Sequence, residues 1–181
     1  PGWEGSEGEA IKEGAAALLA EQMPRAVLRR LYEGFGNLTR EAMLAELAEG
    51  CSLLDFAGHG GPGAWFLDQE VLDAQDFSSL ANSPCLPLVI AIACSTSRFS
   101  DVDCLGEIAL LDEDGGAIAY LGATRVAWIG GGPLATRILA GNLDLLLTRA
   151  FVSELPSLGQ VWAKALTDYV GNHGISRTFP V

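Results

Sequence analysis

The chain has 181 residues, of which 49% are hydrophobic, enough for one domain with a substantial buried core. Its formal net charge of -12 argues against binding to a nucleic-acid backbone. The charge fits either cationic partners such as basic peptides or a solvated acidic surface. Glycine interrupts every apolar run before it reaches the length of a membrane-spanning helix, so no membrane span is predicted.

The first third of the chain predicts two helices, each followed by a strand. An alanine-rich helix over residues 6–23 begins after a serine cap and stops at Pro24, and a short strand follows over residues 25–33. A second helix over residues 38–50 opens with Thr39 as its cap and closes at Gly50. The next strand covers residues 51–57.

The rest of the chain continues the alternation. A glycine-rich loop leads to a helix over residues 72–82 and to the most strand-like run of the chain at residues 86–93. The remaining predicted elements are a helix at 104–114, a strand at 116–123 and helices at 135–151 and 158–170. This alternation predicts an α/β fold over residues 1–181, a mostly parallel sheet with helices on both faces.

Two predicted strands each end in a residue suited to catalysis. The strand at 51–57 runs into Gly58-His59-Gly60, and the strand at 86–93 runs into Cys94. Consecutive parallel strands are usually neighbours, so we expect the imidazole and the thiol to face one crevice. A thiol beside an imidazole provides a nucleophile and its acid–base partner for acyl transfer.

Each member of this pair also has a structural interpretation, because single histidines and buried cysteines are more often structural than catalytic. The other candidates fit less well. His173 follows a helix, where Gly171-Asn172 is typical of a cap, Cys51 starts its strand, and Cys85 sits in a proline-flanked turn. Cys104 is the main competitor, since a helix start can depress a thiol pKa, but its helix is predicted to pack on the sheet. The cysteines show no CxxC spacing and predict neither a zinc site nor a disulfide framework.

Three blocks resemble the gingipain-type family of caspase-like cysteine peptidases over about residues 38–135. They are FAGHGGPGAW, IACSTSRFSD and CLGEIALLDEDGGAIAYLGATRVAW. The resemblance implies a three-layer caspase-like sandwich in which Cys94 is the nucleophile and His59 the general acid. It also implies an oxyanion hole formed by the amides of Gly60 and Cys94, where glycine allows close approach of the main chain.

The resemblance extends to substrate binding and to bound ions. Trp128 is the candidate wall of the pocket for the residue before the scissile bond, Trp65 is an alternative wall, and a core position is the other interpretation of Trp128. No cofactor is required and no metal ligands are assigned, although a structural calcium ion fits the resemblance. Peptides or proteins are the implied substrates, and a secreted or cell-surface location is implied by the resemblance alone.

Six other residues have mainly structural interpretations. Glu107 is expected to pair within its own helix region, and Gly115-Gly116 to link a helix to a strand. Arg98, Asp101 and Asp103 lie near the expected mouth of the crevice, where a solvated loop is the simpler interpretation.

The chain departs from the family pattern near Pro1. The family acid that orients the histidine falls at or before Pro1, and no single position matches the acid that selects arginine in some members. The family's first strand, expected between the strands at 25–33 and 51–57, is also absent. We expect a fragment of a larger protein, with an upstream segment of the same precursor as partner; the alternative is a rearranged sheet.

Three functional classes follow. The first is a cysteine endopeptidase that works through a Cys-His dyad and a thioester. The second is a catalytically silent caspase-like module of a larger secreted or surface protein. The third is a cysteine hydrolase related to the CHAT peptidases, against which GATRVAW argues mildly.

Overall fold

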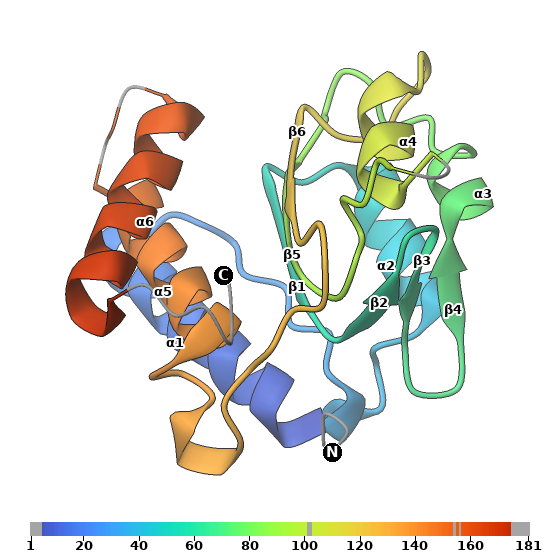
Figure 1. Cartoon of the computed structure of the whole chain (residues 1–181). Coiled ribbons are helices and arrows are strands. Elements are labelled where there is room, and N and C mark those ends of the chain that lie inside the picture. The colour runs from blue at the N-terminus through green and yellow to red at the C-terminus, as the bar shows by residue number, and fades with distance from the viewer. Residues whose placement is uncertain (1–4, 101–102, 154, 156, 175–181) are drawn as a thin grey trace. The chain divides into compact units, whose positions relative to one another are not determined.

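The computed structural model describes residues 5–100, 103–153, 155 and 157–174 (Figure 1). The chain forms two compact units, which we describe separately. The sheet unit is Leu31–Ala127, and the helical unit consists of Pro1–Arg30 together with Trp128–Val181. Helices and a parallel sheet together confirm the predicted mixed α/β class.

The sheet unit alternates short strands and helices. Its elements are η1 (Glu33–Phe35), α2 (Arg40–Glu49), β1 (Leu53–Ala57), β2 (His59–Gly61), β3 (Ala64–Phe66), β4 (Val71–Asp73), α3 (Ala74–Phe77), β5 (Leu88–Ile92), α4 (Leu105–Leu111) and β6 (Ala119–Gly122). The predicted start and end of α2 are confirmed, because the Thr39 side chain accepts a hydrogen bond from the amide of Ala42 and Gly50 follows the helix.

The larger sheet has the order β1-β5-β6, and all of its strands are parallel. Leu53 pairs with Leu88 and Ala57 with Ile92, so β1 and β5 are neighbours as predicted. Every residue of β5 is buried, which explains its continuous apolar sequence. Among the described residues, β1 pairs with β5 alone within this sheet.

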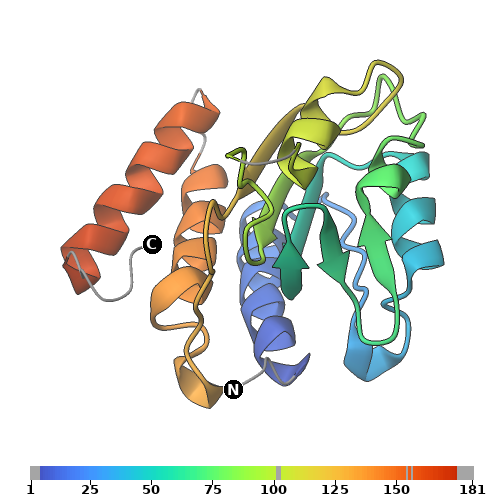
Figure 2. The same ribbon diagram turned by 45° about the vertical axis from the view of Figure 1, so that its right-hand side comes forward.

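The second sheet is a finding that the sequence prediction missed. Strands β2, β3 and β4 form an antiparallel meander where a glycine-rich loop was predicted (Figure 2). The alternation of buried and exposed side chains that marks a strand is short here: Trp65 is fully buried, whereas its neighbour Phe66 is 45% exposed. Leu72 also belongs to this sheet, so the predicted helix over 72–82 shortens to α3.

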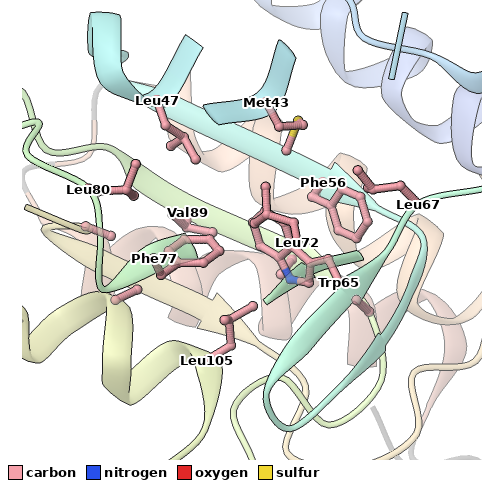
Figure 3. Packing of buried hydrophobic residues seen from close by; sticks show 14 residues of the cluster. Met43, Leu47, Phe56, Trp65, Leu67, Leu72, Phe77, Leu80, Val89 and Leu105 are labelled. Atoms are coloured by element: carbon pink, nitrogen blue, oxygen red, sulfur yellow. The ribbon is translucent and has the colours of Figure 1, made fainter. Parts of the chain in front are cut away.

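One face of the parallel sheet is covered by α2, α4 and the small sheet (Figure 1). Their side chains form a single hydrophobic core around Trp65 (Figure 3). The indole stacks on Phe56 with ring centroids 4.5 Å apart, and its edge meets Phe77 at 5.3 Å. Burial of three large aromatic rings anchors the small sheet to the parallel one.

The helical unit contains α1 (Gly5–Gln22), η2 (Gly132–Leu134), α5 (Leu139–Phe151) and α6 (Leu158–His173). A buried ion pair joins two of the helices: Lys12 Nζ lies 2.9 Å from a carboxylate oxygen of Asp144, which has no exposed side-chain surface. None of the described helices is both long enough and apolar enough to cross a membrane.

Several predicted element boundaries in the N-terminal and C-terminal parts of the chain were wrong. Residues 25–32 form no strand, because they pair with neither sheet. Val27 among them is 78% exposed, whereas Tyr32 is buried. Helix α1 starts at Gly5 rather than after a Ser6 cap. The helix predicted from residue 135 starts at Leu139, after a short 3-10 turn.

Candidate active site

The pairing of β1 with β5 places the two predicted catalytic residues at the same end of the sheet. Paired residues in these strands differ by 35 in number throughout, and the same offset separates His59 from Cys94. The pairing continues past the strands, since the amide of Gly58 donates to the carbonyl of Ile92 at 3.1 Å. His59 is exposed as the first residue of β2, and Cys94 is partly buried just after β5.

Gly60 brings these two strand ends into direct contact. A β-carbon placed on Gly60 would lie 2.8 Å from Cβ of Ala93, 2.9 Å from Cγ2 of Thr96 and 3.1 Å from the carbonyl oxygen of Cys94. Such distances leave no room for a side chain. The main chain that follows His59 therefore lies against the main chain of the candidate nucleophile, as close approach of an oxyanion-hole strand would require.

The loop after Cys94 is held by the segment that follows β6. Ser95 has the left-handed backbone angle φ of 60°, and its amide donates to the carbonyl of Arg125 at 2.8 Å. The amide of Ser97 donates to the carbonyl of Ala123 at 3.0 Å. The Cys94 thiol itself lies 3.9 Å from the carbonyl of Ala127, within reach of a weak S–H···O bond.

Trp65 lies in the core rather than at the surface. Its side chain is 0% exposed, and its indole N–H donates to the hydroxyl of Tyr120 at 3.2 Å. A fully buried indole presents no surface to a substrate in this conformation. Its aromatic contacts and its position opposite Gly60 in the β2–β3 pairing make it a support of the site.

Trp128 begins the second segment of the helical unit and is 48% exposed. Its carbonyl accepts a hydrogen bond from the amide of Ala140, and the neighbouring Ile129 forms a single β-bridge with Leu139. About half of the surface of this residue is thus exposed. The assignment of Trp128 to a substrate pocket stays a prediction.

Cys104 is placed as a structural residue. It is 1% exposed, and burial is the main cause that raises the pKa of its thiol, opposite to the depression that a reactive thiol at a helix start requires. Its amide donates to a carboxylate oxygen of Glu107 at 2.9 Å, which lowers the pKa of Glu107. This contact agrees with the local pairing expected for Glu107.

The remaining cysteines and the second histidine also lie in structural settings. Burial raises the pKa of Cys51, which is partly buried before β1, and Cys85 is exposed in its turn. His173 is the last residue of α6, and its ring lies 4.8 Å from that of Tyr169. Helix α6 therefore runs through residues 171 and 172, which do not form the predicted cap.

Sequence reasoning overlooked three polar residues, two of them near the Cys94 loop and one at the opposite end of the parallel sheet. Thr96 and Tyr120 lie under the Cys94 loop, and Asn82 holds the Gly115-Gly116 link. The Asn82 side chain accepts from the amide of Gly116 at 2.8 Å and donates to its carbonyl at 3.1 Å. Gly116 has a positive φ of 92°, so this link between α4 and β6 depends on glycine. A single Thr, Tyr or Asn carries no spacing signal that would have identified it.

The other polar residues expected at the mouth of the crevice have no assigned role in the site. Arg98 and Asp103 are exposed, and Asp101 lies outside the described residues. Across the described part of the chain, no group of three or more His, Cys, Asp or Glu side chains is arranged to hold a metal ion. The structural calcium ion that fits the resemblance stays a prediction.

The fold is similar to that of two solved structures. One is the complex of Porphyromonas gingivalis RgpB pro- and mature domains, with a TM-score of 0.69 and 17% identity over 91% of this chain and 38% of that chain. The other is the Arg specific cysteine proteinase gingipain R (RGPB), with a TM-score of 0.71 and the same identity and coverages. This chain thus spans 38% of the length of each.

A comparison with curated proteins gives no match. The profile of peptidase family C25, in contrast, matches residues 3–179, almost the whole sequence. This match confirms the resemblance to gingipains that the His-Gly and Ala-Cys blocks indicated. The chain belongs to peptidase family C25.

Proposed function

We propose that this chain is the catalytic part of a cysteine peptidase in which Cys94 is the nucleophile and His59 the general acid. The observation that carries the proposal is the close approach of Gly60 to Ala93, Cys94 and Thr96, which leaves no room for a side chain between the two strand ends. Membership of family C25 supports the reaction class. The structural similarity to gingipain R supports the fold of the site. This chain covers only 38% of that protein.

The proposed reaction has two halves. The Cys94 thiol passes its proton to His59, and its sulfur attacks the scissile carbonyl and forms a C–S bond. The C–N bond then breaks, and His59 delivers that proton to the leaving amine. Water then attacks the resulting thioester, releases the carboxylic acid and returns the proton to the thiol. The amides of Gly60 and Cys94 stabilise the oxyanion in both halves, an interaction that contributes about 3 kcal/mol per donor in comparable sites.

The substrate is a peptide or protein chain. The net charge of -12 favours basic substrates by long-range attraction, and Trp128 is the residue we assign to the pocket before the scissile bond. An upstream segment of the same precursor is the partner that we propose to complete the site.

The first experiment is covalent labelling with acyloxymethyl-ketone peptides that vary in their terminal residue. We expect labelling of the wild-type protein and of Cys104→Ala, and none of Cys94→Ala. Cys85→Ala is the matched control for an exposed thiol outside the site. Mass spectrometry of the labelled peptide identifies the modified cysteine, and the preferred probe reveals the pocket.

Two other outcomes separate the alternatives. Labelling that appears only when upstream sequence is present would mean that the partner segment completes the site. Absence of labelling in both forms would overturn the peptidase proposal and favour a catalytically silent module.

A further inference from the structure

The outer face of the small sheet carries an apolar row that begins at His59. In the pairing of β2 with β3, His59 lies opposite Phe66, and in the pairing of β3 with β4, Phe66 lies opposite Val71. Residues directly opposite each other in an antiparallel sheet project from the same face. His59 is exposed, Phe66 is 45% exposed and Val71 is 42% exposed. We call Phe66 and Val71 the apolar strip.

The opposite face of the same strands already packs in the core. Gly60, Trp65 and Leu72 form the neighbouring row, and the two side chains of this row are fully buried. Side chains of a strand alternate between its faces, so Phe66 and Val71 cannot join this core without a shift of register. Core packing therefore does not explain the apolar strip, whereas the buried row holds the strip in place.

The ring of Phe66 extends toward the candidate site. A β-carbon on Gly61 would lie 3.6 Å from Cε2 and 3.8 Å from Cζ of Phe66, which is an ordinary contact distance. The end of the ring thus lies beside the residue that follows Gly60, the candidate for the oxyanion hole. Gly61 itself places no side chain over this end of the ring.

The order of the strands gives the site a direction. In both views β2 lies between β5 and the other two strands of the small sheet (Figure 1 and Figure 2). Cys94 follows β5, His59 begins β2 and Phe66 ends β3, with neighbouring strands of a sheet about 5 Å apart. In the proposed reaction His59 protonates the leaving amine. The part of the substrate on the amine side of the scissile bond therefore extends past His59 and over Phe66.

We propose that Phe66 forms the subsite for the residue that follows the scissile bond, and that this subsite takes an apolar side chain such as leucine. The inference rests on the proposed peptidase function, because His59 defines the leaving side. The apolar strip exposes parts of two side chains, far less than a protein–protein interface requires, so it suits one or two side chains of a bound peptide. Val71, one strand farther from His59, extends the apolar surface.

The test uses internally quenched peptides that are identical before the scissile bond and carry leucine or glycine after it. We expect kcat/KM of the full chain to be about tenfold or more higher for the leucine peptide, the usual discrimination of an apolar pocket. The ratio should fall to about twofold in Phe66→Thr, which keeps a residue suited to strands, and persist in Phe66→Leu. Phe35→Thr is the matched control and should keep the wild-type ratio, since Phe35 is a 65% exposed phenylalanine of the same unit outside the small sheet.

Aminolysis of the thioester examines the same subsite from the opposite direction. An added amine attacks the thioester carbonyl and forms a C–N bond, His59 takes the proton of the amine and returns it to the departing Cys94 sulfur. We expect leucinamide to compete with water about tenfold better than glycinamide in the wild type and about equally well in Phe66→Thr. A merely structural role of Phe66 would lower the overall rate and leave both ratios unchanged.

A binding experiment separates this inference from the proposed function. Fluorescein-labelled forms of the two peptides are titrated with Cys94→Ala and with the double variant Cys94→Ala/Phe66→Thr. We expect about tenfold tighter binding of the leucine peptide to the first protein and nearly equal binding of both peptides to the second. Such a preference in a chain whose Cys94 no peptide electrophile labels would support the subsite and contradict the peptidase proposal. Equal values for the two peptides in turnover and in binding, or a preference that persists in Phe66→Thr, would overturn the subsite whether or not the protein is active.

Discussion

Gly60 lies so close to Cys94 that a β-carbon on the glycine would sit 3.1 Å from the cysteine carbonyl oxygen. The contact joins two segments that are separated in the sequence by β3, β4, α3 and β5. Because the neighbour on the Cys94 side is backbone, it has little freedom to move away. This relationship makes Gly60 the most sensitive position of the candidate site.

Gly60→Ala should therefore impair both stability and turnover. The new methyl group must displace Ala93, Thr96 or the Cys94 backbone, which we expect to cost about 1–3 kcal/mol of unfolding free energy. We expect kcat to fall about a hundredfold, because the displaced amide no longer faces the oxyanion. Urea unfolding and active-site-titrated kinetics measure the two effects.

Gly63→Ala is the matched control for this substitution. Gly63 follows in the same glycine-rich stretch, yet a β-carbon on it would meet nothing within 4 Å. Its free energy of unfolding should stay within about 0.5 kcal/mol of the wild-type value. Full activity in Gly60→Ala would mean that the close contact with Cys94 is absent in solution.

A second prediction concerns the ion pair that fastens α3 to the start of α2. The guanidinium of Arg40 donates to both carboxylate oxygens of Asp76, through Nε at 2.9 Å and through Nη2, and the amide of Asp73 donates at 3.0 Å. Burial alone would raise the pKa of Asp76, but the hydrogen bonds from Arg40 and Asp73 outweigh it and hold the pKa below its usual value. The small sheet that carries Gly60 ends at this pair.

Asp76→Asn should lower the free energy of unfolding at pH 7 by about 1–2 kcal/mol, the usual loss for a charged hydrogen-bond acceptor. A depressed carboxyl pKa stabilises the fold above the unfolded-state value of about 3.9, and this contribution is lost as the pH falls through the folded-state pKa. The difference between wild type and variant should therefore shrink in acid. Urea unfolding at pH 7 and pH 3 tests this, with Asp168→Asn in the exposed Lys164 pair as control. A constant difference at both pH values would contradict the assigned pKa shift.

The sequence predicted the strand ends well because their signals are local and strong. An apolar run that stops at His59 or Cys94 identifies a strand and its exit, and the neighbour rule for parallel strands then pairs β1 with β5. Capping chemistry likewise placed Thr39 and Gly50 at the ends of α2.

Features that depend on distant contacts were not predictable in the same way. The strands β2, β3 and β4 have three residues each, too few for a periodic signal, and form because Trp65 is buried between Phe56 and Phe77. The strand predicted at 25–33 is absent because a local apolar pattern is not enough: these residues pair with neither sheet. Thr96 and Tyr120 become meaningful only when the fold brings them together.

A third prediction tests the pocket residue. Trp128→Ala should lower kcat/KM for the preferred peptide about tenfold or more, with a smaller effect on peptides that lack the preferred residue, because a pocket wall acts through differential binding. Trp162→Ala is the control, since Trp162 is another partly exposed tryptophan of the helical unit, at 37% against 48% for Trp128. Equal losses for all peptides would point to a structural role for Trp128.

The last prediction concerns the ionisation of Tyr120. Burial raises its pKa to about 12, and the nearby Thr96 hydroxyl and the indole N–H of Trp65 offset part of this effect. An unfolded chain ionises tyrosine near pH 10, so above that pH the unfolded state loses a proton that the native state keeps. The contribution of Tyr120 to the free energy of unfolding is therefore fully present below about pH 10. This free energy falls as the pH rises toward 12, by about 2–3 kcal/mol in total. The melting temperature of wild type should drop more steeply between pH 9 and pH 11 than that of Tyr120→Phe. Ultraviolet titration of tyrosinate gives the independent measure, because the variant should lack one late-titrating group. Parallel melting curves for the two proteins would contradict the raised pKa of Tyr120. So would a variant that lacks a tyrosine titrating near pH 10 instead of the late-titrating one.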